Sequence, residues 1–463
     1  GGVAPRYTKT QTHAHAMVKD NADKPVRTGA YTVRRCDPEL VAPASRTPRE
    51  TKRLSDLDDI GRLHVSLAFF YRGHGEEGDA GMHPAGVIRR ALGEALVHYY
   101  PLAGRVREME MEGRKLVVDC TGEGVLFVQA EADVELADLE AAGLRPPFAC
   151  WDQLLFQVEG SSGVLNSPLL LIQVTRLRCG GFVLALRFNH TICDGMGIAQ
   201  FVNAVGELAR GLPYMKVTPV WSRELIQAPR PSLLYAGAAA HDDVRPPSPP
   251  PASDMVMRSF SFRPSDVVAI KKRLPLILQD TATTFDALAA FVSRARAIAL
   301  EVPPAEVATL GILVNLRGTA QMSLPEGYYG NAVMVSTVRV DAATLRCGDS
   351  LGDTVALVQM AKAVVTSQHL PWMLDELVML GARWFLQPNT FVLSDVRKLG
   401  FDRADFGWGG PVFAGPAEAV FGTGVFIAVK NGDGEDLVVV PLMLPRLAMD
   451  RFAAEVDKLS NVV

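Results

Sequence analysis

Apolar residues along the first half of the chain follow two clear patterns. Over residues 86–99 they recur at the three- and four-residue spacing of an amphipathic helix, and Pro101 would end that helix. Residues 169–178 and 182–189 are apolar runs of strand length, joined by a turn that contains Gly180. The pattern therefore predicts a helix followed later by a β-hairpin.

After this hairpin, the spacing of apolar residues changes from that of a strand to that of a helix. From Met196 onward the apolar positions have helical spacing, and Gly211 is a natural C-terminal stop. His190 follows the second strand directly. It is therefore predicted to lie at a strand end, just before a helix. Two shorter features precede it: a strand that begins at Tyr31 and a hairpin around Gly113.

A proline-rich stretch at residues 245–253 separates the two halves of the chain. The same mixture of strands and helices resumes beyond it. We predict two mixed α/β domains, each with helices flanking its sheet. The predicted divisions are a disordered lead-in at 1–27, an N-terminal domain at 28–220, a crossover linker at 221–255 and a C-terminal domain at 256–463.

Four segments of the second half have a predicted conformation. Thr283 and Asp286 have the spacing of a capping box, which starts a helix that runs to about residue 300. Strands are expected around 310–314 and 333–340, and a helix around 351–367. Further strands are expected through Val440.

Composition narrows the class of protein. The 463 residues are 48% hydrophobic and 21% charged, as in globular proteins. Lys and Arg number 47 against 51 acidic residues, so the net charge of -4 argues against a nucleic-acid partner. The chain contains no run of 18 apolar residues, and its first thirty residues do not resemble a signal peptide. Six cysteines, none in a CxxC pair, predict free thiols, no metal and a cytoplasmic location.

The hexapeptide at 190–195, HTICDG, is the first candidate for chemistry. Histidine has a pKa near 6.5 and can accept a proton at neutral pH. Asp194 could hold the imidazole or brace the turn, and Gly195 would leave room for a ligand. The alternative interpretation is a polar turn with no catalytic role.

A second segment, DFGWG at 405–409, combines one acid with two aromatic residues and two glycines. Gly407 and Gly409 allow unusual backbone dihedral angles, and Trp408 can fill volume. A structural role is favoured for this loop and for Asp405.

Two other motifs are weaker. Residues 348–352 fit the G-x-S-x-G pattern of serine hydrolases, but no strand leads directly into Ser350, which is better explained as a helix N-cap. Residues 195–200 begin like a dinucleotide-binding loop but have Gln200 where glycine is required.

Taken together, HTICDG and DFGWG resemble the two motifs of the plant BAHD acyltransferases. The stretches at 34–43, 100–105, 119–124 and 327–331 are similar to the alcohol acyltransferase branch, which includes benzyl alcohol benzoyltransferases. The resemblance implies two domains like chloramphenicol acetyltransferase with an active-site channel between them. It also implies acyl-coenzyme A as co-substrate, with no permanently bound cofactor.

The resemblance further implies a role for each motif residue. His190 matches the general base, which acts without a covalent acyl-enzyme intermediate. Asp194 matches an acid that pairs with an arginine to shape the site, and Arg317 is the position matched to that arginine. Asp405 matches an acid that is sometimes described as catalytic. Many members have Ser-Trp where this chain has Ser394 and Asp395.

The expected reaction is transfer of a benzoyl, acetyl or hydroxycinnamoyl group to an alcohol hydroxyl. Acylation of an amine such as a polyamine is the alternative, because the same base would serve. A catalytically inactive binding protein on the same scaffold and a hydrolase that uses Ser350 are the remaining hypotheses. We expect a monomer that does not associate with membranes.

Overall fold

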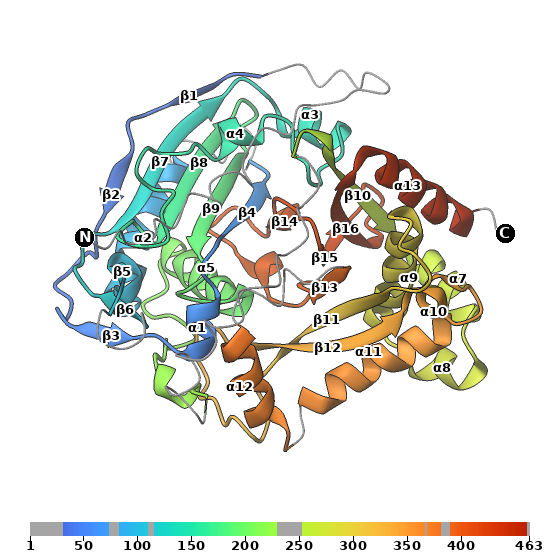
Figure 1. The fold of residues 1–463 in the computed structure, drawn as a ribbon. Helices are drawn as coiled ribbons and strands as arrows, with labels where there is room; N and C mark the ends of the chain where they lie inside the picture. The colour runs from blue at the N-terminus through green and yellow to red at the C-terminus, as the bar shows by residue number, and fades with distance from the viewer. Residues whose placement is uncertain are drawn as a thin grey trace, which may run out of the picture.

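The computed structural model describes residues 31–73, 83–109, 115–228, 252–365, 368–380 and 389–460. They form two large mixed sheets side by side and one small sheet (Figure 1). The predicted lead-in at 1–27 and most of the proline-rich stretch lie outside the described residues.

The N-terminal sheet has seven strands in the order β1-β7-β8-β9-β4-β14, with β2 also paired to β7. β8 and β9 form the antiparallel hairpin predicted from the sequence, whereas β7 and β8 are parallel. The strands are β1 Val33–Arg35, β2 Glu39–Val41, β4 His64–Tyr71, β7 Val125–Ala132, β8 Leu170–Leu177, β9 Phe182–Asn189 and β14 Phe413–Pro416.

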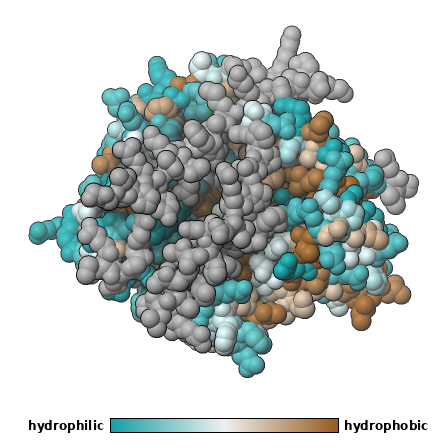
Figure 2. Space-filling model, in the orientation of Figure 1, coloured by the Kyte–Doolittle hydropathy of each residue, from teal (hydrophilic) through white to brown (hydrophobic). Residues whose placement is uncertain are grey.

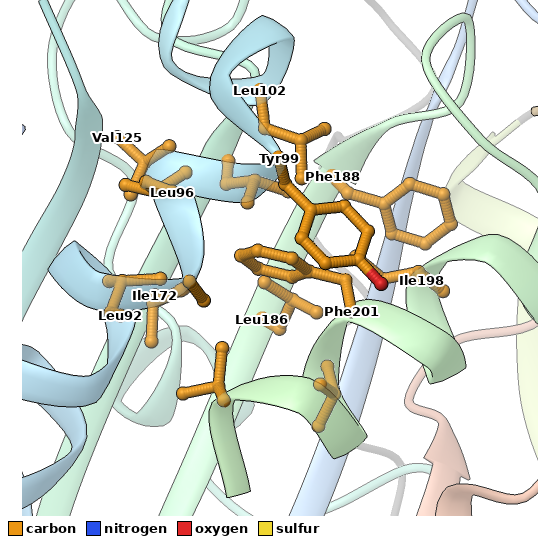
Figure 3. Packing of buried hydrophobic residues seen from close by; sticks show 14 of the residues in the cluster. Leu92, Leu96, Tyr99, Leu102, Val125, Ile172, Leu186, Phe188, Ile198 and Phe201 are labelled. Atoms are coloured by element: carbon orange, nitrogen blue, oxygen red, sulfur yellow. The ribbon is translucent and has the colours of Figure 1, made fainter. Parts of the chain in front are cut away.

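Helices α2 (Pro84–His98) and α5 (Gly195–Ala209) pack on this sheet and bury their apolar faces. Proline fits the first turn of α2 because its missing N–H would have no partner there. Figure 3 shows Leu92 and Leu96 of α2 with Ile172 of β8 and Phe201 of α5 in the same core. The helical spacing of these apolar residues thus reflects burial against the sheet.

The C-terminal sheet has six strands in the order β10-β16-β15-β13-β11-β12, with parallel pairs β11–β13 and β13–β15. Its core includes residues of helices α9, α11 and α13. Thr283 and Asp286 form the predicted capping box at the start of α9. These elements are β10 Met255–Phe262, β11 Val307–Asn315, β12 Val333–Asp341, β13 Thr390–Asp395, β15 Thr423–Lys430, β16 Asp436–Pro445, α9 Thr284–Ala299, α11 Leu351–Val365 and α13 Arg446–Ser460.

Shorter elements complete the described fold. Three of them, β3 (Thr51–Arg53), β5 (Arg105–Glu108) and β6 (Leu116–Asp119), form the small antiparallel sheet. β5 and β6 are the paired strands predicted on either side of Gly113, which itself lies outside the described residues. The remaining helices are α1 Asp56–Ile60, α3 Leu136–Ala141, α4 Trp151–Leu154, α7 Pro264–Lys272, α8 Leu276–Thr281, α10 Ala342–Arg346 and α12 Leu370–Leu380, with 3-10 turns η1 Tyr100–Ala103, η2 Arg223–Leu225, η3 Ala252–Asp254 and η5 Phe401–Arg403.

The two halves of the chain are not independent in space, although the predicted domain division stays a prediction. Strand β14, from the C-terminal half, pairs with β4 in the N-terminal sheet (Figure 1). Phe70 and Val183 of that sheet share an apolar cluster with Ile427 and Val439 of the other sheet. A strand exchanged between the sheets satisfies the edge of β4 and ties the halves together.

The start of the predicted linker is also packed structure. Arg223 is buried within η2, and Ile226 and Ala228 are buried as well. Ile226 belongs to an apolar cluster with Leu57 of the N-terminal half and Leu316 of the C-terminal half, so this part of the segment adds to the core between them.

In the view of Figure 2, the coloured part of the surface has hydrophobic residues interspersed among hydrophilic ones. Among the described residues, no helix has the length and apolar character needed to cross a membrane.

Candidate active site

His190 lies at the end of β9, four residues before the N-cap of α5, as the sequence predicts. Its backbone N–H donates to the Leu63 carbonyl at 2.8 Å, which extends the pairing of β9 with β4. The half-buried imidazole stacks on Phe188, with ring centres 5.5 Å apart. Its Nδ1 atom is buried and has no hydrogen-bond partner among the described residues.

The environment of His190 favours the neutral imidazole. Burial lowers its pKa below the usual 6.5, because the charged ring would lose hydration. The carboxylates of Asp194 and Asp58 oppose this shift without reversing it. At neutral pH the ring is thus uncharged, which is the form a general base needs.

Asp194 is nearly completely buried, and its carboxylate is occupied by donors other than the His190 ring. It caps α5 by accepting the Gly197 N–H at 2.9 Å, and it accepts the Ala332 N–H at 2.9 Å. The Arg317 guanidinium donates to both of its oxygens, at 2.8 and 3.0 Å. The residues paired by the family resemblance are therefore in contact in the structure.

Arg317 also holds the segment that contains Ala332. Its side chain donates to the carbonyl oxygens of Gly330 at 2.7 Å and Tyr328 at 3.2 Å. Arg317 follows β11 in the C-terminal half, whereas Asp194 belongs to the N-terminal half. This bidentate pair joins the two halves next to the candidate base.

A second buried carboxylate in the site escaped the sequence analysis. Asp58 forms an ion pair with Arg223 at 3.1 Å, and both side chains are almost fully buried. Its Oδ1 accepts the backbone and side-chain N–H groups of Asn331, at 2.9 and 2.8 Å. The Asn331 side chain also donates to the His190 carbonyl oxygen at 2.8 Å.

Only part of this network carried a signal in the sequence. Ser55 and Asp58 have capping-box spacing, and they form that box at the start of α1. Asn331 belongs to the stretch at 327–331 that supported the resemblance. Arg223 lies in the predicted linker, where no pattern pointed to a buried charge.

Gly195 lies close to Leu399 at the start of α5. A methyl group at this position would lie 2.6 Å from Cδ1 of Leu399. A larger residue would require the flexible Leu399 side chain to shift, and the expectation that Gly195 leaves room for a ligand stays a prediction.

The DFGWG loop contacts the other end of α5. Asp405 accepts the backbone N–H groups of Gly407 at 2.8 Å and Gly409 at 2.9 Å. Both glycines have positive φ, which favours glycine, and Trp408 is buried against Phe182.

The placement of this loop explains its role. A methyl group on Gly206, near the C-terminal end of α5, would lie 2.6 Å from the Asp405 carbonyl oxygen. His190 precedes the opposite end of that helix, roughly 15 Å away at 1.5 Å per residue. The geometry therefore supports a structural role for Asp405 and gives it no contact with the candidate base.

The remaining candidates lie apart from this site or form local pairs. Ser350 follows α10 and precedes α11, so it does not occupy the strand-to-helix turn of a hydrolase elbow. Asp395, in the place where many family members have tryptophan, pairs with Arg397 at 2.7 Å. The described residues contain no cluster of three or more potential metal ligands, and all six cysteines are free.

Comparison with known proteins decides the family. A model described as Transferase family matches residues 32–459. The chain belongs to this family, the BAHD acyltransferases. It is 44% identical over 438 residues to benzyl alcohol O-benzoyltransferase of Petunia hybrida, covering 93% of this chain and 94% of the relative. It is 41% identical over 444 residues to (Z)-3-hexen-1-ol acetyltransferase of Arabidopsis thaliana, covering 94% and 96%.

Solved structures confirm the predicted BAHD fold class. The crystal structure of vinorine synthase matches with a TM-score of 0.70 at 21% identity, over 92% of this chain and 98% of that one. TRI101 of F. graminearum, complexed with coenzyme A and T-2 mycotoxin, matches with a TM-score of 0.68 at 16% identity, over 88% and 97%. This BAHD chain is therefore an acyltransferase with two mixed-sheet halves.

Proposed function

We propose that this acyltransferase moves a benzoyl or other small acyl group from coenzyme A to the hydroxyl of an alcohol. The observation that carries the proposal is the position of the half-buried His190, which follows β9 and accepts a hydrogen bond from Asn331 of the other half. The relatives named above are a benzoyltransferase and an acetyltransferase of alcohols, which supports ester formation over acylation of an amine. A cytoplasmic location and a monomeric state stay predictions.

The proposed reaction uses His190 twice. Nε2 takes the proton of the acceptor hydroxyl as its oxygen attacks the thioester carbonyl carbon, forming a tetrahedral intermediate. Collapse of this intermediate breaks the carbon–sulfur bond, and the departing thiolate of coenzyme A recovers the proton from the imidazolium. The products are an ester and free coenzyme A, so atoms and charge balance without a covalent acyl-enzyme.

The buried acids support this chemistry indirectly. Asp194 and Arg317 fix the turn that follows His190, and they link it to the segment around Ala332. We assign Asp194, Arg317 and Gly195 to the architecture of the site, and Gly407, Trp408, Gly409 and Asp405 to the support of α5.

Release of free thiol from purified protein tests the function. Acetyl-, benzoyl-, hydroxycinnamoyl- and malonyl-coenzyme A would be offered with benzyl alcohol, hexanol, a hydroxycinnamyl alcohol and spermidine, and a chromogenic disulfide would report coenzyme A. We expect release that requires both a donor and an alcohol. Release only with spermidine would favour the amine acyltransferase. Binding of acyl-coenzyme A without turnover of any acceptor would favour the inactive binding protein.

The pH dependence of kcat/KM follows from the pKa of His190. Because burial places this pKa below 6.5, the ring stays neutral as the pH falls through 7. We expect activity to be lost at lower pH, as protonation of Nε2 removes the base, with a midpoint below 6.5. The measurement is kcat/KM from about pH 5 to pH 9. A midpoint above 6.5 would contradict the effect assigned to burial.

A further inference from the structure

His190 is held through its backbone from two directions. Its N–H donates to the Leu63 carbonyl oxygen at 2.8 Å, and its own carbonyl oxygen accepts the Asn331 side-chain N–H at 2.8 Å. No carboxylate among the described residues bonds to the imidazole: Nδ1 is buried without a well-placed hydrogen bond, and hydrogen bonding from the Asn331 side chain and from the backbone of His190 itself raises the pKa of the ring. In a catalytic triad a carboxylate on Nδ1 would orient the ring. Here another contact must do so.

Gly61 lies close to this side of His190. It ends the short helix α1, and a methyl group built on it would lie 2.8 Å from the His190 carbonyl oxygen and 3.2 Å from Nδ1. The Gly61 backbone has φ -74° and ψ 32°, a conformation open to any residue. The glycine is therefore required by its closeness to His190 and not by its dihedral angles.

The same helix connects to the Asn331 anchor. Asp58, inside α1, accepts both N–H groups of Asn331, and the Asp58 carbonyl oxygen accepts the Gly61 N–H at 3.0 Å. The capping box with Ser55 and the ion pair with Arg223 fix Asp58 in turn. Helix α1 thus ends at Gly61 and, through Asp58, fixes Asn331.

We propose that Gly61 and Asn331 are positioning residues that hold the His190 imidazole in its reactive orientation, in place of a hydrogen-bonded carboxylate. Gly61 forms a close wall beside Nδ1, and Asn331 fixes the adjoining carbonyl group. The assignment rests on the proposed function of His190 as general base, and it predicts that displacement of the ring lowers turnover more than substrate binding.

Gly61→Ala tests the role of the close approach between Gly61 and His190, and Gly86→Ala is the matched control. Gly86 is exposed on α2, and a methyl group there would meet no atom within 4 Å. We expect Gly61→Ala to lower kcat by about 10- to 100-fold, because misplacement by about 1 Å can cost 100-fold. The KM for acyl-coenzyme A should stay within about twofold, whereas Gly86→Ala should match the wild type in both.

Asn331→Ala provides a second test that adds no bulk. Asp58 keeps the Asn331 backbone N–H, the Ser55 N–H at 2.9 Å and Arg223 as partners, so α1 should persist. We expect a smaller loss of kcat than with Gly61→Ala, again with little change in KM. If Gly61→Ala does not fold, the kcat of Asn331→Ala alone tests the positioning role.

NMR of histidine-labelled protein separates positioning from function. His190→Ala identifies the His190 ring signals by their disappearance. We expect Gly61→Ala and Asn331→Ala to move those signals, and Gly86→Ala to leave them in place. Moved signals in a protein without transferase activity would contradict the proposed function but support the positioning role. If Gly61→Ala and Asn331→Ala fold and keep both the ring signals and kcat unchanged, the positioning role is wrong, although the proposed transferase function is unaffected.

Discussion

Replacing His190 with alanine is expected to lower kcat by about 10²- to 10⁴-fold, the range that general-base catalysis contributes. The variant keeps the backbone N–H that bonds to Leu63 and the carbonyl that bonds to Asn331. Because the Asn331 side chain also donates to Asp58 and to the His190 carbonyl oxygen, removal of the ring leaves it with partners. Thiol release would measure the loss, and a thermal melt should show that the fold persists.

The matched control for this prediction is His98→Ala. His98 is exposed at the end of α2, so its removal should change neither turnover nor melting temperature. Turnover near the wild-type value in His190→Ala would refute the mechanism proposed here. Loss of folding in His190→Ala would instead show that the ring is a structural element of the core.

Segments with local signals were predictable from the sequence. The end of β9 at Asn189 and the start of α5 just after Asp194 follow from apolar periodicity and from the change of period between them. The capping box at Thr283 likewise identified the start of α9. Because His190 lies between two such elements, its place at a strand end could be predicted without any knowledge of the tertiary structure.

Contacts between distant parts of the chain were not predictable in this way. Asn331 and Asp58 are separated by 273 residues, and neither has a periodic pattern that points to the other. The exchange of β14 depends on the open edge of β4, which no local pattern reveals. The buried charge of Arg223 is compensated only after folding brings Asp58 to it.

The two buried carboxylates perform related tasks on either side of His190. Asp194 forms an ion pair with Arg317 and accepts a hydrogen bond from the Ala332 N–H. Asp58 forms an ion pair with Arg223 and accepts a hydrogen bond from Asn331. Three of these partners belong to the segment 317–332 of the C-terminal half. The ion pairs and hydrogen bonds that position the segment around His190 thus also join the two halves of the chain. The stability of the fold and the geometry of the site therefore depend on the same residues.

Asp194→Ala should accordingly be strongly destabilising. It leaves the mostly buried Arg317 guanidinium without its carboxylate, and it removes the acceptor of the Gly197 and Ala332 N–H groups. Breaking a buried pair by removing one partner costs about 3–5 kcal/mol, so soluble yield should fall as well. Chemical denaturation would measure the free energy of unfolding.

A surface ion pair supplies the control for Asp194→Ala. Asp436 pairs with Lys430 at 2.6 Å, but the two side chains are 81% and 68% exposed. Asp436→Ala should therefore cost less than about 1 kcal/mol, although it also removes a close carboxylate. Asp194→Asn, which keeps an oxygen for the cap of α5 but loses the charge, should fall between the two. Equal stability of Asp194→Ala and Asp436→Ala would mean that the Asp194–Arg317 pair does not brace the two halves, and the base would then need another explanation for its fixed position.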